Sequence, residues 1–262
     1  MLSDPRSERV KGIARLNQKD ARYETGLFLL EGFQGLKELA FHHDLIVEVF
    51  ATEAAVSARP ELFADLPVEV TLVNDRVMDR ISDTKTPQGV VSVAYQLDVD
   101  LELVINDKPK LVALMDQVRD PGNAGTILRA ADAAGADGIV FSKDSVDLYN
   151  PKLVRSTTGS LFHLPTVIEA DSANALADLK AAGLQVFATS GGGRPITEIE
   201  SQLQNPTVWV FGNEAHGLSQ DLLDLADEVV GLPIYGIAES LNLATAASVC
   251  LYQSAFAQNR SR

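Results

Sequence analysis

Three polar stretches in the second half of the chain carry side chains suited to binding a sugar hydroxyl and stabilising an anion. The first places Asn123 and Arg129 within RDPGNAGTILRAADAAGA, residues 119–136. The second, VFGNEAHGLS, contains Glu214, and the third, ESLNLATAAS, contains Asn242. Carboxamides and carboxylates form hydrogen bonds with hydroxyls, and a guanidinium stabilises a developing negative charge. These residues are therefore our candidates for chemistry.

The first stretch follows an apolar run and precedes a helical pattern, as nucleotide-binding loops do. It matches neither the GxGxxG nor the GxxxxGK[ST] fingerprint, so the sequence does not predict a phosphate cradle. Asn123 would also suit the N-cap of the helix, so a purely structural role is the alternative to a functional one for this residue. Arg129 lies in an alanine-rich helix, where a cation needs a partner or a water-filled site. We therefore favour a functional role for Arg129.

Alternating strand-like and helical segments must position these stretches. The predicted strands are residues 110–116, 138–142, 164–169, 184–190, 207–213 and 228–234. The predicted helices lie near residues 123–135, 151–160, 172–183, 219–226 and 240–258, the last with Ser240 as a candidate cap. Apolar strands that alternate with helices indicate a parallel sheet covered on both faces. Because ligands bind beyond the carboxyl ends of such strands, we expect the three stretches to meet there.

The first half of the chain predicts a smaller α/β domain. Its segments include a charged helix over residues 5–22 and strands near 28–32, 45–52 and 68–75. An acidic, less periodic segment then separates it from the second half. We expect a first domain at residues 1–97, a linker at 98–109 and a second domain at 110–262.

Composition places the chain among globular proteins, with 46% hydrophobic and 22% charged residues. It contains no apolar run of membrane-spanning length, and its charged N-terminus lacks the apolar core of a signal peptide. We expect a cytoplasmic protein without membrane association. Cys250 is the single cysteine, which excludes an internal disulfide and a cysteine-cluster zinc site. We expect its side chain to be buried, and we expect no metal.

The net charge of −14 opposes general binding to nucleic acid. The N-terminus is the exception, because six basic residues face four acidic ones before residue 26. These basic residues are Arg6, Arg9, Lys11, Arg15, Lys19 and Arg22. We expect either a solvated helix face or, together with Arg119, Arg129, Lys152 and Arg155, a restricted contact surface for a polyanion.

Together the three stretches resemble the motifs of the SpoU, or TrmH-type, RNA 2′-O-methyltransferases of the SPOUT superfamily. The matching patterns are N-x-G-x-x-x-R from Asn123 to Arg129, F-G-N-E-x-x-G-L from Phe211, and S-L-N from Ser240. YNPKLVRSTTGSLFHLP, residues 149–165, is similar to the stretch between the first two motifs. The charged helix, FLLEG and DTKTPQGVVSVA resemble the ribosomal-protein-like substrate-binding domain that many members carry. The resemblance therefore covers nearly the whole chain.

The resemblance implies a parallel sheet whose C-terminal segment forms a deep trefoil knot, a homodimer, and S-adenosylmethionine bound inside the knot. It also implies which residues contact this cofactor: Thr189, Gly212, Leu232, Ile234, Ser240 and Leu241. One departure from the family pattern follows S-L-N, where Leu243 and Ala244 replace the usual valine and serine. That departure removes a hydroxyl group from the third motif.

The resemblance further implies transfer of a methyl group to a ribose 2′-oxygen, with catalytic roles for Arg129, Asn123, Glu214 and Asn242. A guanidinium is effectively never deprotonated, so we expect Arg129 to stabilise the developing alkoxide while a phosphate oxygen or water accepts the proton. Asn123 and Asn242 would position the ribose, and Glu214 would orient Arg129 or Asn123.

The N-terminal domain favours ribosomal RNA as the substrate, with transfer RNA as the alternative. A second alternative is a catalytically weak RNA-binding factor of the same fold that acts in ribosome assembly. A nucleotide-binding oxidoreductase is disfavoured because neither phosphate fingerprint is present. The sequence names neither the methylated nucleotide nor its base, and it does not say whether modification confers antibiotic resistance.

Overall fold

The computed structural model describes residues 1–260, which divide into two compact units. Unit 1 comprises Met1–Leu97 and Asp147–Phe162. Unit 2 comprises Asp98–Val146 and the described chain from His163 onward. Each unit has a β-sheet and a core of its own.

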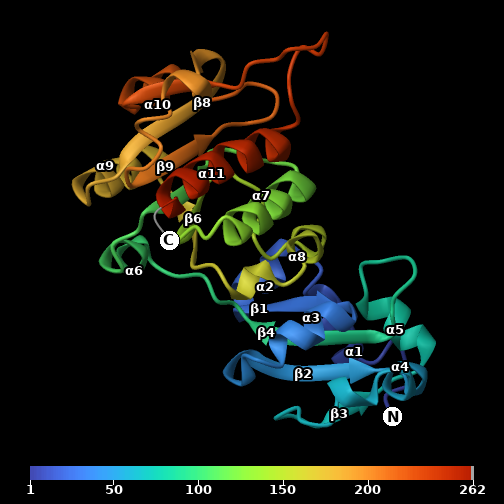
Figure 1. Ribbon diagram of the computed structural model, residues 1–262. Helices are drawn as coiled ribbons and strands as arrows, with labels where there is room; N and C mark the ends of the chain where they lie inside the picture. Colours follow the sequence, from blue (N-terminus) through green and yellow to red (C-terminus); the bar gives the residue numbers. More distant parts are fainter. Residues whose placement is uncertain (261–262) are drawn as a thin grey trace. The chain divides into compact units, whose positions relative to one another are not determined.

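Unit 2 is built on a parallel sheet with the strand order β10-β8-β9-β5-β6-β7 (Figure 1). Its strands are β5 (Leu111–Met115), β6 (Gly138–Ser142), β7 (Thr166–Ala170), β8 (Gln185–Pro195), β9 (Thr207–Phe211) and β10 (Glu228–Gly231). The predicted parallel α/β sheet and its strands are confirmed. β8 continues to Pro195, beyond the predicted end at residue 190, because a register shift lets Val230 and Gly231 of β10 pair with its last residues.

Helices cover both faces of this sheet. They are α6 (Leu101–Asn106), α7 (Pro121–Ala133), α9 (Ser172–Ala181), α10 (Gln220–Leu225) and α11 (Leu243–Asn259), with a short 3₁₀ helix at Ile196–Glu198. Val112 and Leu114 of β5 pack into one apolar layer with Leu176 of α9 and Leu222 of α10. Alternate side chains of a strand point to opposite faces, so the odd-numbered residues of β5 face the other layer.

The other layer is the pair α7 and α11, which lie side by side in Figure 1 and both begin at the carboxyl edge of the sheet, where Asn242 contacts Asn123. Trp209 of β9 is fully buried, and its indole Nε1 donates a hydrogen bond to Ser254 Oγ of α11 at 2.9 Å. Burying an indole ring requires a partner for its N–H group, and Ser254 supplies that partner. α11 is thereby fixed against the strands that end at the candidate site.

Unit 1 contains a mixed sheet with the strand order β1-β4-β2-β3. Its strands are β1 (Leu27–Glu31), β2 (Ile46–Ala51), β3 (Val70–Leu72) and β4 (Val90–Tyr95). Its helices are α1 (Glu8–Arg15), α2 (Lys19–Thr25), α3 (Gly32–Leu39), α4 (Glu53–Ala58), α5 (Asp75–Ile81) and α8 (Pro151–Thr157), with 3₁₀ helices at His43–Leu45, Pro60–Leu62 and Ser160–Phe162. Side chains of α1 and α5 form one core with Leu29 and Phe50.

Residues 147–162 belong to unit 1, although they lie in the sequence between strands of unit 2. The buried guanidinium of Arg22 pairs with Asp147 and also donates to the Leu16 carbonyl at 2.8 Å. Tyr149 is fully buried against Phe28 of β1, and its hydroxyl accepts the Leu97 N–H at 2.8 Å. This division differs from the domain boundaries that the sequence predicts.

The segment predicted as a linker, residues 98–109, also has a structure of its own. It contains α6, and Val104 is buried in the core of unit 2. The Val99 N–H bonds the Thr166 carbonyl at 2.9 Å. The segment is therefore an integral part of unit 2.

Among residues 1–260, no helix is both long enough and apolar enough to span a membrane.

Candidate active site at the carboxyl edge of the parallel sheet

Three loops of unit 2 meet beyond the carboxyl ends of its strands, where they surround a cavity of about 370 Å³. The loops join β5 to α7, β9 to α10, and β10 to α11. The residues around the cavity are Asn123, Thr189, Ser190, Gly191, Asn213, Glu214, Val230, Leu232, Ile234, Glu239, Ser240, Leu241, Asn242, Leu243, Ala246 and Cys250. The convergence predicted for the three polar stretches is therefore observed.

The Glu214 carboxylate ties the second loop to the first. Its Oε2 accepts the Arg119 N–H at 3.2 Å, and its Oε1 accepts the Asp120 N–H at 3.1 Å. The same Oε1 accepts a hydrogen bond from Asn123 Nδ2 at 3.2 Å. Of the two partners expected for Glu214, the structure shows contact with Asn123 and none with Arg129.

Asn242 continues this network into the third loop. Its Nδ2 donates to Asn123 Oδ1 at 2.9 Å. Its own Oδ1 accepts the Ala244 and Thr245 N–H groups, so Asn242 is the N-cap of α11. Ser240 does not fill that capping position. Asn123 likewise is not a cap, because the Asp120 carboxylate accepts the Asn123 N–H at 2.7 Å and begins α7 three residues earlier.

The environment of Glu214 favours its ionised form. Partial burial raises the pKa of this carboxyl, but backbone N–H donors and the Asn123 amide outweigh burial and leave the pKa below its ordinary value. Glu214 is therefore a carboxylate at neutral pH and acts only as a hydrogen-bond acceptor.

Asn213 supports the Glu214 loop from behind. Its Oδ1 accepts the Ala215 and His216 N–H groups, which closes a tight turn. Its Nδ2 donates to the carbonyl of Gln117 at 2.8 Å. Gln117 has a positive φ of 54°, and its N–H donates to Ser142 Oγ at 2.8 Å. The F-G-N-E motif thus links β9 to the end of β5 as well as carrying the carboxylate.

Most of the predicted cofactor-binding residues surround the cavity: Thr189, Leu232, Ile234, Ser240 and Leu241. Gly212 does not line it. Gly212 instead allows close packing within its loop, because a Cβ there would lie 2.5 Å from the carbonyl carbon of Gly217. Of the four residues with predicted catalytic roles, Asn123, Glu214 and Asn242 surround the cavity.

Arg129 lies apart from the network. It is six residues beyond Asn123 in α7, which turns its side chain about 240° around the helix axis. The side chain is exposed, and no hydrogen bond or ion pair joins it to another residue of the described chain. Arg129 is therefore available to an external group.

The cavity carries acidic rather than basic groups. Glu214 and Glu239 are its charged residues, and none of the described residues around it is Lys, Arg or His. Such a lining disfavours the diphosphate of a nicotinamide cofactor and complements a cationic ligand. No cluster of three or more metal-ligating side chains occurs within residues 1–260.

Sequence reasoning missed several of the residues around the cavity, including Ser190, Glu239 and Cys250. Cys250 was expected to be buried, and it is only 1% exposed. Its contribution to the cavity follows from helical spacing, because Leu243, Ala246 and Cys250 share one face of α11. The sequence held one signal for that face: Asn242, a predicted site residue, lies at the start of this helix, so the helix face that follows it borders the same site.

The Cys250 thiol should resist alkylation in the folded protein. Burial raises its pKa to about 12, so only about 10⁻⁴ of the thiol is ionised near pH 8. We expect no labelling by iodoacetamide within an hour under native conditions and complete labelling in urea, as measured by intact-mass spectrometry. Rapid native labelling would contradict the burial of this group.

The N-terminal basic residues are largely engaged within unit 1. Arg22 is buried in its pair with Asp147 and cannot contact a polyanion. Exposed ion pairs join Arg9 to Glu48, Lys11 to Glu8 and Arg15 to Glu24. Exposed pairs contribute little to stability, so these three cations can exchange their carboxylate partners for phosphates. Arg155 is bound by two carboxylates and is not a free cation.

Two family models match this chain. The model of the SpoU rRNA Methylase family matches residues 110–252, and the model of the MRM3-like substrate binding domain matches residues 7–92. The first match covers the strands and loops that surround the cavity. The second covers most of the N-terminal part of unit 1.

Curated relatives and solved structures agree with these matches. The chain is 31% identical over 252 residues to the 23S rRNA (guanosine(2553)-2′-O)-methyltransferase RlmP of Bacillus subtilis, covering 96% of this chain and 97% of the relative. It is 32% identical to the 23S rRNA (uridine(2479)-2′-O)-methyltransferase of Streptomyces viridochromogenes, covering 92% and 86% of the two chains. An AdoMet-bound rRNA methyltransferase from Sinorhizobium meliloti superposes with a TM-score of 0.83 at 32% identity, covering 97% and 96%.

Proposed function

This chain belongs to the SpoU rRNA methylase family, and we propose that it transfers a methyl group from S-adenosylmethionine to a ribose 2′-hydroxyl of 23S ribosomal RNA. The chain is an RNA methyltransferase by its family, and its methyl donor is S-adenosylmethionine. The observation that carries the proposal is the Glu214–Asn123–Asn242 network, which joins three family motifs around one acidic cavity.

The cavity fits S-adenosylmethionine in charge and in polarity. Leu232, Ile234 and Leu241 offer apolar surface for the adenine. Glu214 and Glu239 complement a cationic ligand. When bound, S-adenosylmethionine supplies an electrophilic methyl group on a sulfonium.

The chain's own residues orient and activate the ribose. We assign Asn123 and Asn242 to hydrogen bonds with the sugar, because their amides already lie in contact at the cavity. Glu214 fixes the orientation of Asn123. Arg129 stabilises the developing alkoxide and holds the adjacent phosphate, while a phosphate oxygen or water accepts the proton.

We also propose a homodimer, and the surface beside this site supports it. Val249, Tyr252 and Phe256 are exposed on α11, and Arg129 is exposed on the neighbouring α7. Exposed apolar side chains in a row are typical of subunit interfaces. A second copy that packs on this surface about a two-fold axis would bring Arg129 of one protomer toward the cavity of the other.

The remaining features of the proposal are a trefoil knot between β10 and α11, a ribosomal-protein-like fold for unit 1, and a cytoplasmic location. The knot proposal is supported by how tightly the chain leading into this segment packs on β8: a Cβ on Gly193 of β8 would lie 2.6 Å from the Val230 carbonyl carbon of β10. The location is supported by the ribosomal RNA substrates named for the relatives.

The decisive experiment compares ribose methylation in cells with and without this gene. Mass-spectrometric mapping of 23S rRNA should show one 2′-O-methyl nucleotide that is absent from the deletion strain and restored by the purified protein with S-adenosylmethionine. A change confined to transfer RNA would replace the ribosomal assignment. No change in either RNA would overturn the function.

RNA binding should depend on salt despite the acidic composition. If Arg9, Lys11 and Arg15 exchange their carboxylates for three phosphates, affinity for a 23S rRNA fragment should fall roughly 20- to 40-fold between 50 and 200 mM KCl. Fluorescence anisotropy of a labelled fragment measures this slope. An affinity that does not change over that range would exclude phosphate contacts as the basis of binding.

A further inference from the structure

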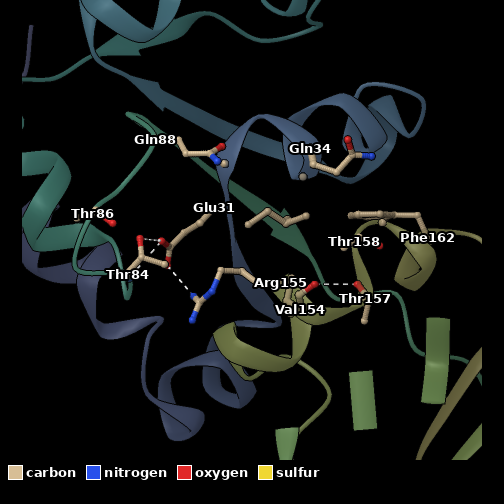
Figure 2. A pocket seen from close by; sticks show the side chains of 14 residues that line it. Glu31, Gln34, Thr84, Thr86, Gln88, Val154, Arg155, Thr157, Thr158 and Phe162 are labelled. Atoms are coloured by element: carbon tan, nitrogen blue, oxygen red, sulfur yellow. Dashed lines mark hydrogen bonds and ion pairs between the residues drawn. The ribbon is translucent and has the colours of Figure 1, made fainter. Parts of the chain in front are cut away.

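Unit 1 contains a second cavity, of about 260 Å³, that shares no residue with the cavity of unit 2. Its walls come from the junction of β1 and α3, from the loop that precedes β4, and from residues 154–162 (Figure 2). The last wall is part of residues 147–162, which belong to unit 1 although they lie within the sequence that the SpoU methylase model matches. The function derived above assigns no role to this cavity.

Two glycines allow the walls of this cavity to approach each other. Gly32 has φ +89°, and a Cβ there would lie 2.8 Å from Gln88 Oε1. Gly159 has φ +107°, and a Cβ there would lie 2.4 Å from Glu38 Cγ. Residues with side chains adopt these backbone conformations with strain, and they would also collide with the opposite wall. The shape of the cavity therefore depends on both glycines.

The charged groups at the cavity are paired with one another and fixed in position. Glu31, whose side chain is 6% exposed, accepts the Asp83 N–H at 2.7 Å and the Thr84 hydroxyl at 2.7 Å. Arg155 bridges Glu31 at 3.2 Å and Asp83 at 2.8 Å. One cation thus faces two carboxylates, and this excess of negative charge disfavours a phosphate ligand.

The accessible surface that remains is neutral and includes one aromatic ring. Gln34 donates through Nε2 to Glu38, which leaves its carbonyl oxygen without a partner among the described residues. Gln88 accepts the Phe33 N–H, which leaves its amide N–H groups without a partner in the same part of the chain. The Phe162 ring lines the same cavity, on the side of Gln34 (Figure 2), and stacks on His42 with ring centroids 5.3 Å apart.

From these groups we infer that the cavity of unit 1 binds an unpaired nucleobase of the RNA substrate. A base is planar and neutral, and the donors and acceptors along its edges can pair with the free carbonyl of Gln34 on one side of the cavity and the free amide of Gln88 on the other (Figure 2). Phe162 supplies an aromatic surface for the ring. The inference rests on the proposed function, because that function makes RNA the ligand, and it adds a site that selects the RNA outside the methylation cavity.

The test fills the cavity from an exposed helix position in the full-length protein. Gln34 is exposed on α3, so Gln34→Trp should fold and occlude the cavity, and Gln34→Ala should remove the amide alone. Ser57→Trp on exposed α4 is the matched control, because Ser57 does not line the cavity. Anisotropy with a labelled 23S rRNA fragment measures Kd, and calorimetry measures S-adenosylmethionine binding.

We expect Gln34→Trp to weaken RNA binding about tenfold and Gln34→Ala to weaken it a few-fold, with unchanged S-adenosylmethionine affinity. Ser57→Trp should bind RNA as the wild type does. Photo-cross-linking of RNA that contains 4-thiouridine or 6-thioguanosine should label a peptide from residues 31–35 or 154–162, and Gln34→Trp should abolish that label.

Wild-type RNA affinity in Gln34→Trp, with cross-links elsewhere, would overturn the nucleobase site. That result is distinct from failure of the proposed function. A wild-type protein that binds RNA without methylating it would refute the methyltransferase activity, and the same Kd and cross-link measurements would still decide the site.

Discussion

Replacing Arg129 with lysine is expected to lower kcat by about 10²- to 10³-fold while leaving the affinity for S-adenosylmethionine unchanged. The two effects separate because Arg129 does not line the cavity and forms no hydrogen bond or ion pair with a described residue that does. Lysine keeps the charge but loses the planar pair of donors that can bind an alkoxide and a phosphate oxygen together. The expected loss is therefore one of transition-state stabilisation.

Single-turnover methylation of a 23S rRNA fragment, with calorimetric titration of S-adenosylmethionine, measures both quantities. Arg260→Lys at the end of α11 is the matched control, since it makes the same chemical change at an exposed position of unit 2. An Arg129→Lys enzyme with a wild-type rate would show that bidentate contact is not required.

Variants at the same position test the proposed homodimer. If Arg129 completes the partner's site, mixed dimers of Arg129→Ala and Glu214→Gln subunits contain one intact composite site. Random mixing should then restore about a quarter of the wild-type rate, because half of the dimers are mixed and each has one working site of two. Mixtures that stay inactive would place Arg129 and Glu214 in the same protomer's site.

Local patterns in the sequence were sufficient for the sheet of unit 2. Its strands are short apolar runs bounded by turn residues, and their alternation with helices fixes a parallel arrangement. Local patterns did not identify which residue caps each helix. Asp120, Asn123, Ser240 and Asn242 all suit an N-cap, and tertiary contacts decide which of them is used.

The membership of residues 147–162 in unit 1 was beyond any local pattern. It depends on contacts such as Arg22 with Asp147 and Arg155 with Glu31, whose partners are more than a hundred residues apart. Periodicity identifies α8 as a helix but not the sheet against which it packs. The nucleobase cavity was missed for the same reason, because its walls come from three distant segments.

Replacing Glu214 with glutamine should lower kcat about 10²-fold and also weaken S-adenosylmethionine binding several-fold. Glutamine retains one carbonyl oxygen, but its NH₂ group must face either Asn123 Nδ2 and the Asp120 N–H or the Arg119 N–H. A donor then opposes a donor at the junction of two loops. Glu198→Gln is the control, since its exposed pair with Arg194 contributes little.

A double-mutant cycle shows whether Glu214 acts through Asn123. Asn242→Ala removes the hydrogen bond to the other side of the Asn123 amide. The double variant with Glu214→Gln should therefore lose less kcat than the product of the two single losses. Effects that multiply fully would mean that the two residues act independently and that the hydrogen-bonded network is incidental to the rate.

The pH dependence of stability gives an independent measure of the same carboxylate. Hydrogen bonds hold the pKa of Glu214 below its ordinary value of 4.5, so its ionised form stabilises the fold above that pH. Glutamine does not titrate. The difference in free energy of unfolding between wild type and Glu214→Gln should therefore be constant from pH 6 to 8 and should shrink as pH falls through the lowered pKa. Urea denaturation across this range measures the difference, and a gap that widens toward acid pH would mean that the protonated carboxyl is the form the network stabilises.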